Sequence, residues 1–310
     1  LPLRIFPSFK KDTVISFKYG VASGDPTNTN VILWTKILPI GNPEIRVRWE
    51  VSTLSNFSNL VTFGHARTNS KNDYTVKVDA KIPRQYNGKK LYYRFLADGK
   101  NSEIGTTSTL PIENPTNFNI AFCSCSNYPA GYFNAYKEIA NNEKINLVLH
   151  LGDYLYEYGH GGYGSKDAEK MGRIVNPRHE MLSLDDYRKR YATYRSDADL
   201  KLLHQRKPMI SVWDDHEFTN DSWKKGAQNH SDEEGSFAKR KKNALQAYYE
   251  WMPIREKGRK DKIWRNFKVG NLINLMMLDT RSYERNKQLD IENYFKENSF
   301  DQVNFLKDLI

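Results

Sequence analysis

The 310-residue sequence contains only two cysteines, Cys123 and Cys125, and a single residue separates them. A disulfide-rich scaffold needs several cysteines spread along the chain, so that class of fold is excluded. The pair can close a small strained ring, remain as two buried thiols, or offer one thiolate to a metal ion. On composition alone, two buried thiols are the most common arrangement.

Long hydrophobic runs are also absent. No apolar segment approaches the ~20 residues that a transmembrane helix requires, so we expect no membrane span. The hydrophobic content of 39% and the aromatic content of 13% are nevertheless sufficient for packed cores, which excludes a globally disordered chain. The first residues, 1–11, contain neither an initiator methionine nor a signal-peptide pattern, so we expect that an export signal has already been removed.

Charge of one sign is in moderate excess: 47 lysines and arginines face 37 acidic residues, a formal net charge of +10. Local basic clusters occur at 239–242 and 255–262. Such clusters are usually solvated surface. No RNP-like or helix-turn-helix pattern accompanies them, so the charge does not indicate a nucleic-acid-binding domain.

The first third of the chain, from residue 17 to about 110, alternates apolar and polar residues with a period of two. Turn residues such as Asp98-Gly99 separate these segments, which is typical of an antiparallel β-sandwich. Two prolines within 110–117 indicate a boundary. The clearest predicted strands are 31–37, 45–53, 74–80 and 90–99.

The pattern changes after this boundary. Strand-like segments are now apolar throughout and alternate with segments of helical spacing, which predicts a parallel sheet covered on both faces. We expect strands at 118–124, 145–151, 208–214 and 272–279. We expect helices within 131–144, 183–206 and 237–252.

Polar side chains gather where these strands end, and the carboxyl ends of parallel strands are where ligands bind. That much acidic charge at one edge would repel itself unless cations lay among it. Oxygen ligands suit Fe³⁺, Ca²⁺ or Mg²⁺, and a thiolate suits iron or zinc. The sequence therefore predicts a metal site. The residues concerned are 124–127, Asp153, Tyr156, 214–221 and 279–281.

Each of these residues has a simpler interpretation when taken alone. Asp153 is explained equally well as a helix cap or turn former, and Tyr156 is more often a packed aromatic. The metal interpretation gains its support because both occur together with the acidic block 214–217 after the next predicted strand. A response-regulator or nucleotide-binding fold also gathers aspartates in this way, but the sequence has no glycine-rich phosphate loop.

The segment Gly152-Asp153-Tyr154-Leu155-Tyr156 matches the GDxxY pattern of purple acid phosphatases. Its wider context resembles the PhoD-type alkaline phosphatase/phosphodiesterase family of the calcineurin-like metallophosphatase superfamily. Several collinear segments carry this resemblance, namely 17–36, 122–140, 149–159, 187–200, 212–221 and 277–285. The resemblance implies an immunoglobulin- or fibronectin-like β-sandwich domain over 1–112 and an α/β metallophosphatase domain over 113–310.

The resemblance also implies roles for individual residues. The metals would be Fe³⁺ and Ca²⁺, with other divalent metals as alternatives. The implied metal ligands are Cys125, Asp153, Tyr156, Asp215 and Asn220, with Asp221 as a further ligand of calcium or phosphate. His216 would donate a hydrogen bond to a phosphoryl oxygen or leaving group, or else orient a neighbouring group. Arg281 and Arg190 would neutralise phosphate charge, although such arginines often form structural pairs.

The function implied is hydrolysis of phosphate monoesters or diesters by metal-activated water. No GxSxG or HExxH segment indicates a protein nucleophile or a zinc protease. We expect nucleic acid to interact with this protein only as a phosphodiester substrate. The alternative is an inactive or truncated homologue that binds an anionic ligand outside the cell. By resemblance, we expect an extracytoplasmic protein, periplasmic or secreted.

The sequence departs from the family in one respect. Family members take further metal ligands from histidines late in the chain, but the last histidine here is His230. The sequence also stops within 300–310, a segment with the spacing of an amphipathic helix. We therefore expect an α/β domain that is incomplete at its C-terminus, and a second polypeptide could complete it.

Overall fold

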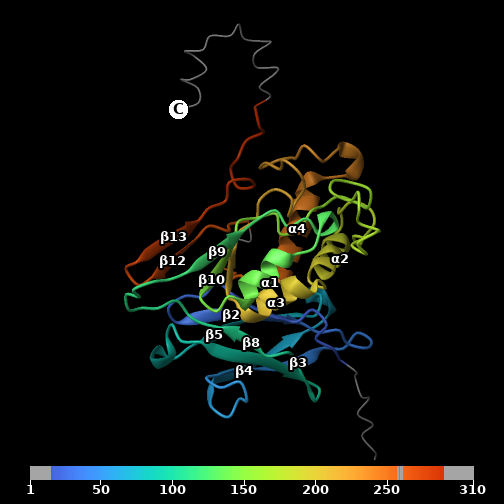
Figure 1. Cartoon of the computed structure of the whole chain (residues 1–310). Coiled ribbons are helices and arrows are strands. Elements are labelled where there is room, and N and C mark those ends of the chain that lie inside the picture. Colours follow the sequence, from blue (N-terminus) through green and yellow to red (C-terminus); the bar gives the residue numbers. More distant parts are fainter. Residues whose placement is uncertain (1–14, 257, 259–260, 290–310) are drawn as a thin grey trace, which may run out of the picture.

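The structure is a computed structural model that describes residues 15–256, 258 and 261–289. The expected processed N-terminus at 1–11 and the amphipathic segment at 300–310 lie outside the described residues. The described chain forms two larger sheets and a separate two-stranded sheet, with helices packed mainly around the second half (Figure 1).

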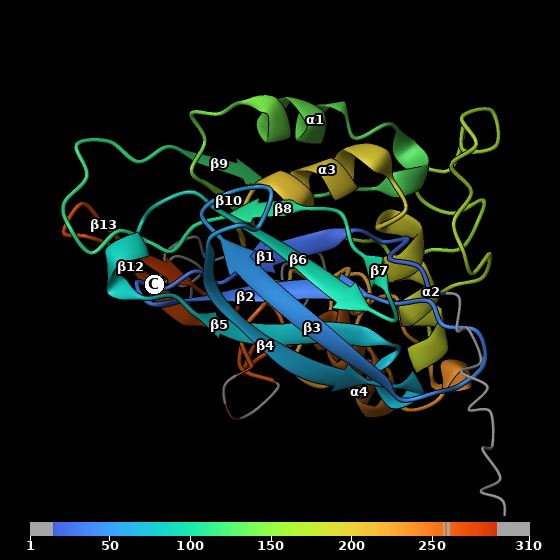
Figure 2. The ribbon, with the colours of Figure 1, turned by 90° about the horizontal axis from the view of Figure 1, so that it is seen from below.

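The first half of the chain forms two antiparallel layers. One layer has the strand order β4-β3-β6-β7, with β8 paired to β6. Figure 2 shows β3, β4 and β6 as a layer in front of β1 and β2. The bounds are β3 (Ile45–Ser52), β4 (Leu60–Thr68), β6 (Leu91–Ala97), β7 (Lys100–Asn101) and β8 (Gly105–Thr107).

The opposite layer contains β1 (Val21–Gly24), β2 (Asn30–Lys36) and β5 (Thr75–Lys81), which also pair in antiparallel fashion. Apolar side chains from both layers meet in one buried cluster that includes Leu33 and Phe95. Alternation at period two places one side of each strand in this cluster, and burial of these side chains stabilises the pair of layers. The predicted strands 31–37, 45–53, 74–80 and 90–99 all lie in these two layers.

Parallel strands β9 (Ile120–Cys123), β10 (Leu147–His150) and β11 (Met209–Ser211) form the core of the second half. All four residues of β10 are buried, as expected for a central strand covered on both faces. The sequence predicted a β-sandwich domain over 1–112 and an α/β domain over 113–310, but it did not predict a sheet that the two halves share. β1 pairs with β11 in parallel, so one sheet runs β5-β2-β1-β11-β10-β9.

Gly24 makes this junction between the halves feasible. It is the residue of β1 that pairs with Met209 of β11. A β-carbon at Gly24 would lie 2.3 Å from the carbonyl oxygen of Pro253 and 2.6 Å from that of Met209. Only glycine allows such a close approach of three backbone segments. Because this is a tertiary contact, alternation along the sequence did not reveal it.

Four α-helices lie within the described residues. Ser183 and Asp186 form a capping box at the start of α2, and Asp197 caps α3. Figure 2 shows α1 and α3 on one side of the shared sheet and α4 on the other. The bounds are α1 (Asn134–Asn141), α2 (Leu184–Tyr194), α3 (Ala198–Arg206) and α4 (Phe237–Trp251). Short 3-10 turns occupy Ser70–Asn72, Arg84–Tyr86, Tyr128–Ala130 and Asp232–Glu234.

The segment 272–279, which we predicted as a fourth strand of the parallel sheet, does not pair with that sheet. β13 (Ile273–Met277) pairs in antiparallel fashion with β12 (Arg265–Val269) in a sheet of their own. The physical reason is a tight turn at Gly270, which has a positive φ of 50° and joins the two strands as a hairpin. Within the range that the structure describes, no helix is long and apolar enough to cross a bilayer.

Candidate metal centre

The candidate centre is formed by the loops that follow β9, β10 and β11. The loops after β9 and β10 are joined by main-chain hydrogen bonds, from Cys125 N to Gly152 O (3.2 Å) and from Ser126 N to Asp153 O (2.8 Å). The loops after β10 and β11 approach each other at Gly152, where φ is +109°. Three segments that are distant in the sequence thus meet at one edge of the sheet, as predicted for the carboxyl ends of parallel strands.

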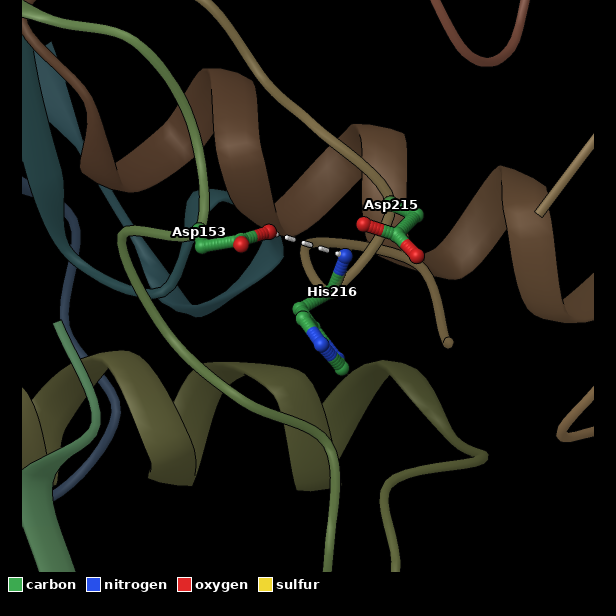
Figure 3. Close-up of side chains that lie close together, drawn as sticks. All are labelled: Asp153, Asp215 and His216. Atoms are coloured by element: carbon green, nitrogen blue, oxygen red, sulfur yellow. Dashed lines mark hydrogen bonds between the residues drawn. The ribbon is translucent and has the colours of Figure 1, made fainter. Parts of the chain in front are cut away.

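Asp153 is the point at which the predicted ligands converge. Its Oδ2 lies 3.4 Å from the Sγ of Cys125 and 3.5 Å from the hydroxyl of Tyr156. Its Oδ1 accepts a hydrogen bond from the main-chain N–H of His216 at 3.4 Å. Figure 3 shows this hydrogen bond and the carboxylate of Asp215 on the other side of the His216 backbone.

Asp153, Asp215 and His216 form a compact buried group. One potential ligand atom from each lies within 4.8 Å of the others. Two carboxylates, an imidazole, a phenol and a thiol in one place are a donor set that suits a hard or borderline cation such as iron, calcium or another divalent metal. The residues present therefore fit the metals that the family resemblance implies.

Without a cation, the site disfavours negative charge. Burial, together with the charges of Asp214 and Asp215, raises the pKa of Asp153 above its usual range. Burial and the charge of Asp153 also raise the pKa values of Cys125 and Tyr156. A bound cation reverses this balance, because it favours the negatively charged form of each acidic group that faces it.

Glu157 favours the protonated form of His216. The Nδ1 of His216 lies 2.7 Å from the Oε2 of Glu157, which is fully buried. Burial of the imidazole opposes protonation, but the hydrogen bond and charge of Glu157 outweigh it and raise the pKa of His216 to about 9. The ring also lies against that of Tyr156, with centroids 4.1 Å apart.

The side chain of Glu217 links the loop after β10, which carries Asp153, to the loop after β11, which carries Asp214 and Asp215. It accepts main-chain hydrogen bonds from Asp153 (3.1 Å) and Tyr154 (2.7 Å) after β10, and from Asp214 (2.9 Å) after β11. Its side chain is buried, and burial together with the nearby charge of Asp153 raises its pKa. Glu217 therefore positions the backbone from which both ligand loops project.

Arg281 places positive charge at the acidic edge. Its Nε pairs with Asp214 at 2.5 Å, and its Nη1 lies 3.9 Å from Asp215 and 3.5 Å from Asp221. Asp221 itself donates its main-chain N–H to Asp215. Although β13 does not join the parallel sheet, the loop that follows it still reaches the site.

Arg190 does not reach this edge, in contrast to the contact with phosphate that we expected from the sequence. The side chain is fully buried, and it donates hydrogen bonds to main-chain carbonyls of Tyr156 and Pro177, among others. A guanidinium that is buried and engaged in this way cannot also face a substrate. Arg190 instead supports the loop that carries Tyr156.

Asn220 lies next to the group formed by Asp153, Asp215 and His216, and its side-chain amide is directed toward Gln228 and Asp221. Its amide nitrogen donates to Gln228 at 2.8 Å and approaches Asp221 at 3.5 Å, while its main-chain N–H donates to Glu157 at 2.7 Å. The structure thus places Asn220 next to Asp221, whose main chain contacts Asp215. A role for the Asn220 side chain as a ligand stays a prediction.

Three residues of the centre adopt the left-handed backbone region that non-glycine residues rarely occupy. Cys125, Asp153 and Asp221 have φ values of 58°, 54° and 50°. Such conformations cost of order 1–3 kcal/mol each and concentrate at functional sites. The loops are therefore shaped to aim these side chains, rather than relaxed around them.

Two acidic residues of the candidate centre were missed by sequence reasoning or given no role. Glu157 was not selected, and Glu217 was noted only as part of an acidic block. Both lie inside segments that carried the family resemblance, 149–159 and 212–221. An acidic residue embedded between aromatic residues, as Glu157 is between Tyr156 and Tyr158, was the available signal.

Known proteins similar to this chain support the same interpretation. A family model described as PhoD-like phosphatase matches residues 120–306, and one described as the N-terminal domain of PhoD-like phosphatase matches residues 7–111. Alkaline phosphatase D of Bacillus subtilis (strain 168) is 39% identical over 282 residues, which are 86% of this chain and 47% of that protein. A solved structure titled "Structure of PhoD" has a TM-score of 0.80 and 38% identity, covering 92% of this chain and 55% of that chain. The chain thus spans about half the length of these relatives.

Proposed function

The chain belongs to the PhoD-like phosphatase family, and from this premise we propose that it hydrolyses phosphate monoesters, diesters or both at the cluster around Asp153 and Asp215. The observation that carries the proposal is the convergence at Asp153. A buried carboxylate lies within 3.5 Å of both a thiol and a phenol, at the edge of a parallel sheet. A carboxylate, a thiol and a phenol at one point form a donor set that suits a cation.

We propose that Cys125, Asp153 and Tyr156 hold an iron(III) ion and that Asp215, Asn220 and Asp221 serve calcium, with other divalent metals as alternatives. The donor types support this assignment, because a thiolate and a phenolate suit iron and oxygen ligands suit calcium. When bound, the metals would supply Lewis acidity that activates water and neutralises charge on the phosphate.

The remaining residues bind and orient the substrate. The imidazole of His216 lies beside the two aspartates and, when protonated on Nε2, donates a hydrogen bond to a phosphoryl oxygen or to the leaving group. Arg281 brings positive charge next to Asp215 and neutralises part of the substrate's charge. Asp214 holds Arg281 in this position through their ion pair.

The test combines metal analysis with an activity assay on the purified chain. We expect bound iron and calcium by elemental analysis, and hydrolysis of p-nitrophenyl phosphate or bis(p-nitrophenyl) phosphate that a chelator abolishes. Asp153→Asn should lose both metal and turnover. A folded chain that turns over neither substrate, or that turns them over equally well after metal removal, contradicts the proposal. Binding of these anions without turnover would instead favour a binding module.

Two further proposals concern the setting of the enzyme. The family resemblance supports an extracytoplasmic location, which fractionation of intact cells tests directly. Exposed apolar side chains at Phe122 on the edge strand β9 and at Met276 support contact with a further polypeptide. Native mass spectrometry of the protein from its source would reveal such a partner.

A further inference from the structure

Glu157 is a fully buried carboxylate whose two oxygens have different partners. Its Oε2 faces the Nδ1 of His216 at 2.7 Å. Its Oε1 lies close to three donors, the main-chain N–H of Asn220 (2.7 Å), the side-chain amide of Asn229 (2.8 Å) and the hydroxyl of Thr219 (3.2 Å). No lysine or arginine is needed to hold this group, because neutral donors and one imidazole surround it.

This arrangement determines which nitrogen of His216 carries a proton toward Glu157. A carboxylate surrounded by donors on one oxygen is an acceptor, so the Nδ1 of His216 must be the donor in their hydrogen bond. The opposite ring nitrogen, Nε2, is then the atom left for the cluster or for a substrate. The rings of Tyr156 and Tyr158, whose centroids lie 4.1 Å and 5.6 Å from that of His216, restrict rotation of the imidazole.

The carboxylate is itself anchored from α4. Asn229, which donates to Glu157, also donates to the Oε1 of Glu180 at 3.0 Å. Arg240 in α4 is buried, pairs with Glu180 at 2.6 Å and donates to the main-chain oxygen of Asn229 at 3.0 Å. Glu157 therefore belongs to a connected network of fixed groups rather than to an isolated pair.

We propose that Glu157 is a positioning residue of the phosphatase site, which holds a proton on Nδ1 of His216 and aims the Nε2 edge of the ring toward the substrate. Glu157 does not touch the reacting atoms and acts through His216. The inference rests on the proposed function only in so far as His216 acts on a phosphoester. The Glu157–His216 contact can be tested without any turnover.

The first test is nuclear magnetic resonance of the full chain labelled with ¹⁵N-histidine, in the metal-free form so that no paramagnetic iron broadens the signal. We expect a slowly exchanging, downfield Nδ1–H proton for His216, assigned by its loss in His216→Asn, and we expect Glu157→Gln to abolish or markedly shift it. Absence of this proton in the unsubstituted protein overturns the proposal, even if Glu157→Gln fails to fold. The same holds for a resonance that Glu157→Gln leaves unchanged.

The second test is a double-substitution cycle on the metal-loaded enzyme. We expect Glu157→Gln to lower kcat by about 10- to 100-fold with KM changed less than about twofold, as for groups that orient another active-site residue. The effect should disappear in the His216→Asn background, and Glu157→Asp should restore part of the rate. Effects of Glu157→Gln and His216→Asn that simply multiply would overturn the proposal.

A matched control separates positioning from general loss of a buried carboxylate. Glu50 in β3 is buried and accepts from Arg48 (2.7 Å) and Arg94 (2.9 Å), and it belongs to the antiparallel layer remote from the cluster. Glu50→Gln should lower the melting temperature without altering the His216 resonance or kcat. If the chain proves to hydrolyse no phosphoester, the resonance test still decides the contact, so failure of the proposed function and failure of this inference are distinguishable.

Discussion

The main-chain nitrogen of Asp214 lies so near Gly152 that a β-carbon on Gly152 would stand 2.4 Å from it. The glycine immediately before Asp153 is therefore where the loops after β10 and β11 come together. Its φ of +109° is, in addition, a conformation that side-chain-bearing residues rarely adopt. Together with the hydrogen bonds to Glu217, this close approach sets the spacing between Asp153 and the acidic segment 214–217.

We predict that Gly152→Ala destabilises the protein by about 2 kcal/mol or more and lowers metal content and activity, because the β-carbon would force the two loops apart. Denaturant unfolding and elemental analysis measure both effects. The matched control is Gly161→Ala, where φ is +88° but no atom lies within 4 Å of the added carbon. This control should cost about 1 kcal/mol from backbone strain alone. Equal effects at both glycines would contradict the role assigned to the close approach.

The two cysteines should behave differently despite their proximity. We predict that Cys125→Ser lowers iron content and activity at least about tenfold, because its Sγ lies 3.4 Å from Asp153. Cys123→Ser should retain both, since the Sγ of Cys123 approaches the carbonyl oxygen of Leu149 (3.6 Å) and burial raises its pKa to about 12. Elemental analysis of the two variants side by side provides the measurement. Equal iron content in the two would exclude Cys125 as a ligand.

Substitution of Arg281 and of Arg190 should have different effects, the first mainly on activity and the second mainly on stability. We predict that Arg281→Lys lowers kcat/KM for a phosphoester about tenfold with little change in melting temperature, because it loses the fixed geometry of the guanidinium at Asp214. Arg190→Lys should lower stability by about 2 kcal/mol and change KM less than twofold, since buried carbonyls lose their donors. A larger effect of Arg190→Lys on KM would reinstate it as a substrate contact.

Two buried histidines predict loss of stability in acid. Burial lowers the pKa of His150 to about 3, and burial with the nearby charges of Arg195 and His150 lowers that of His204. Between about pH 6.5 and pH 3 the unfolded chain therefore binds more protons, so the free energy of unfolding falls as pH falls. Each such histidine contributes up to about 1.4 kcal/mol per pH unit.

Substitution of His204 tests this pH dependence. Its Nε2 bonds the hydroxyl of Tyr154 at 2.8 Å, and glutamine can keep an acceptor there. We expect His204→Gln to weaken the pH dependence of the free energy of unfolding, by an amount that corresponds to at most one bound proton. Urea unfolding from pH 7 to pH 4 measures this dependence. His65→Gln, on the exposed face of β4, is the control and should leave the slope unchanged. A slope that His204→Gln does not alter would show that other groups govern acid unfolding.

Much of the site could be predicted because its residues follow apolar strands directly. Asp153 comes shortly after β10, and Asp215 shortly after β11, so strand topology alone places them at one edge of the sheet. The hairpin of β12 and β13 was not predicted as such, because an apolar strand has the same pattern whichever partner it pairs with. Only the turn at Gly270 indicated an antiparallel neighbour.

Burial explains why the two arginines could not be told apart beforehand. Arg190 and Arg281 both occur near motifs of the family, yet one lies in the interior and the other at the acidic edge. Position in the sequence carries little information on which carbonyls or carboxylates surround a long side chain. The same holds for the pairing of β1 with β11, which brings together Gly24 and Met209.

By itself, the sequence determined the family, the strands and helices with clear periodicity, and the acidic, thiol and phenol groups that follow the strands, because each of these depends on short local patterns. Only the tertiary structure decided that Glu157 holds His216, that Glu217 ties two loops together, and that the two halves share a sheet. These features depend on contacts between residues far apart in the chain, such as the 59 positions between Glu157 and His216, and burial of polar groups at such contacts leaves no periodic trace in the sequence.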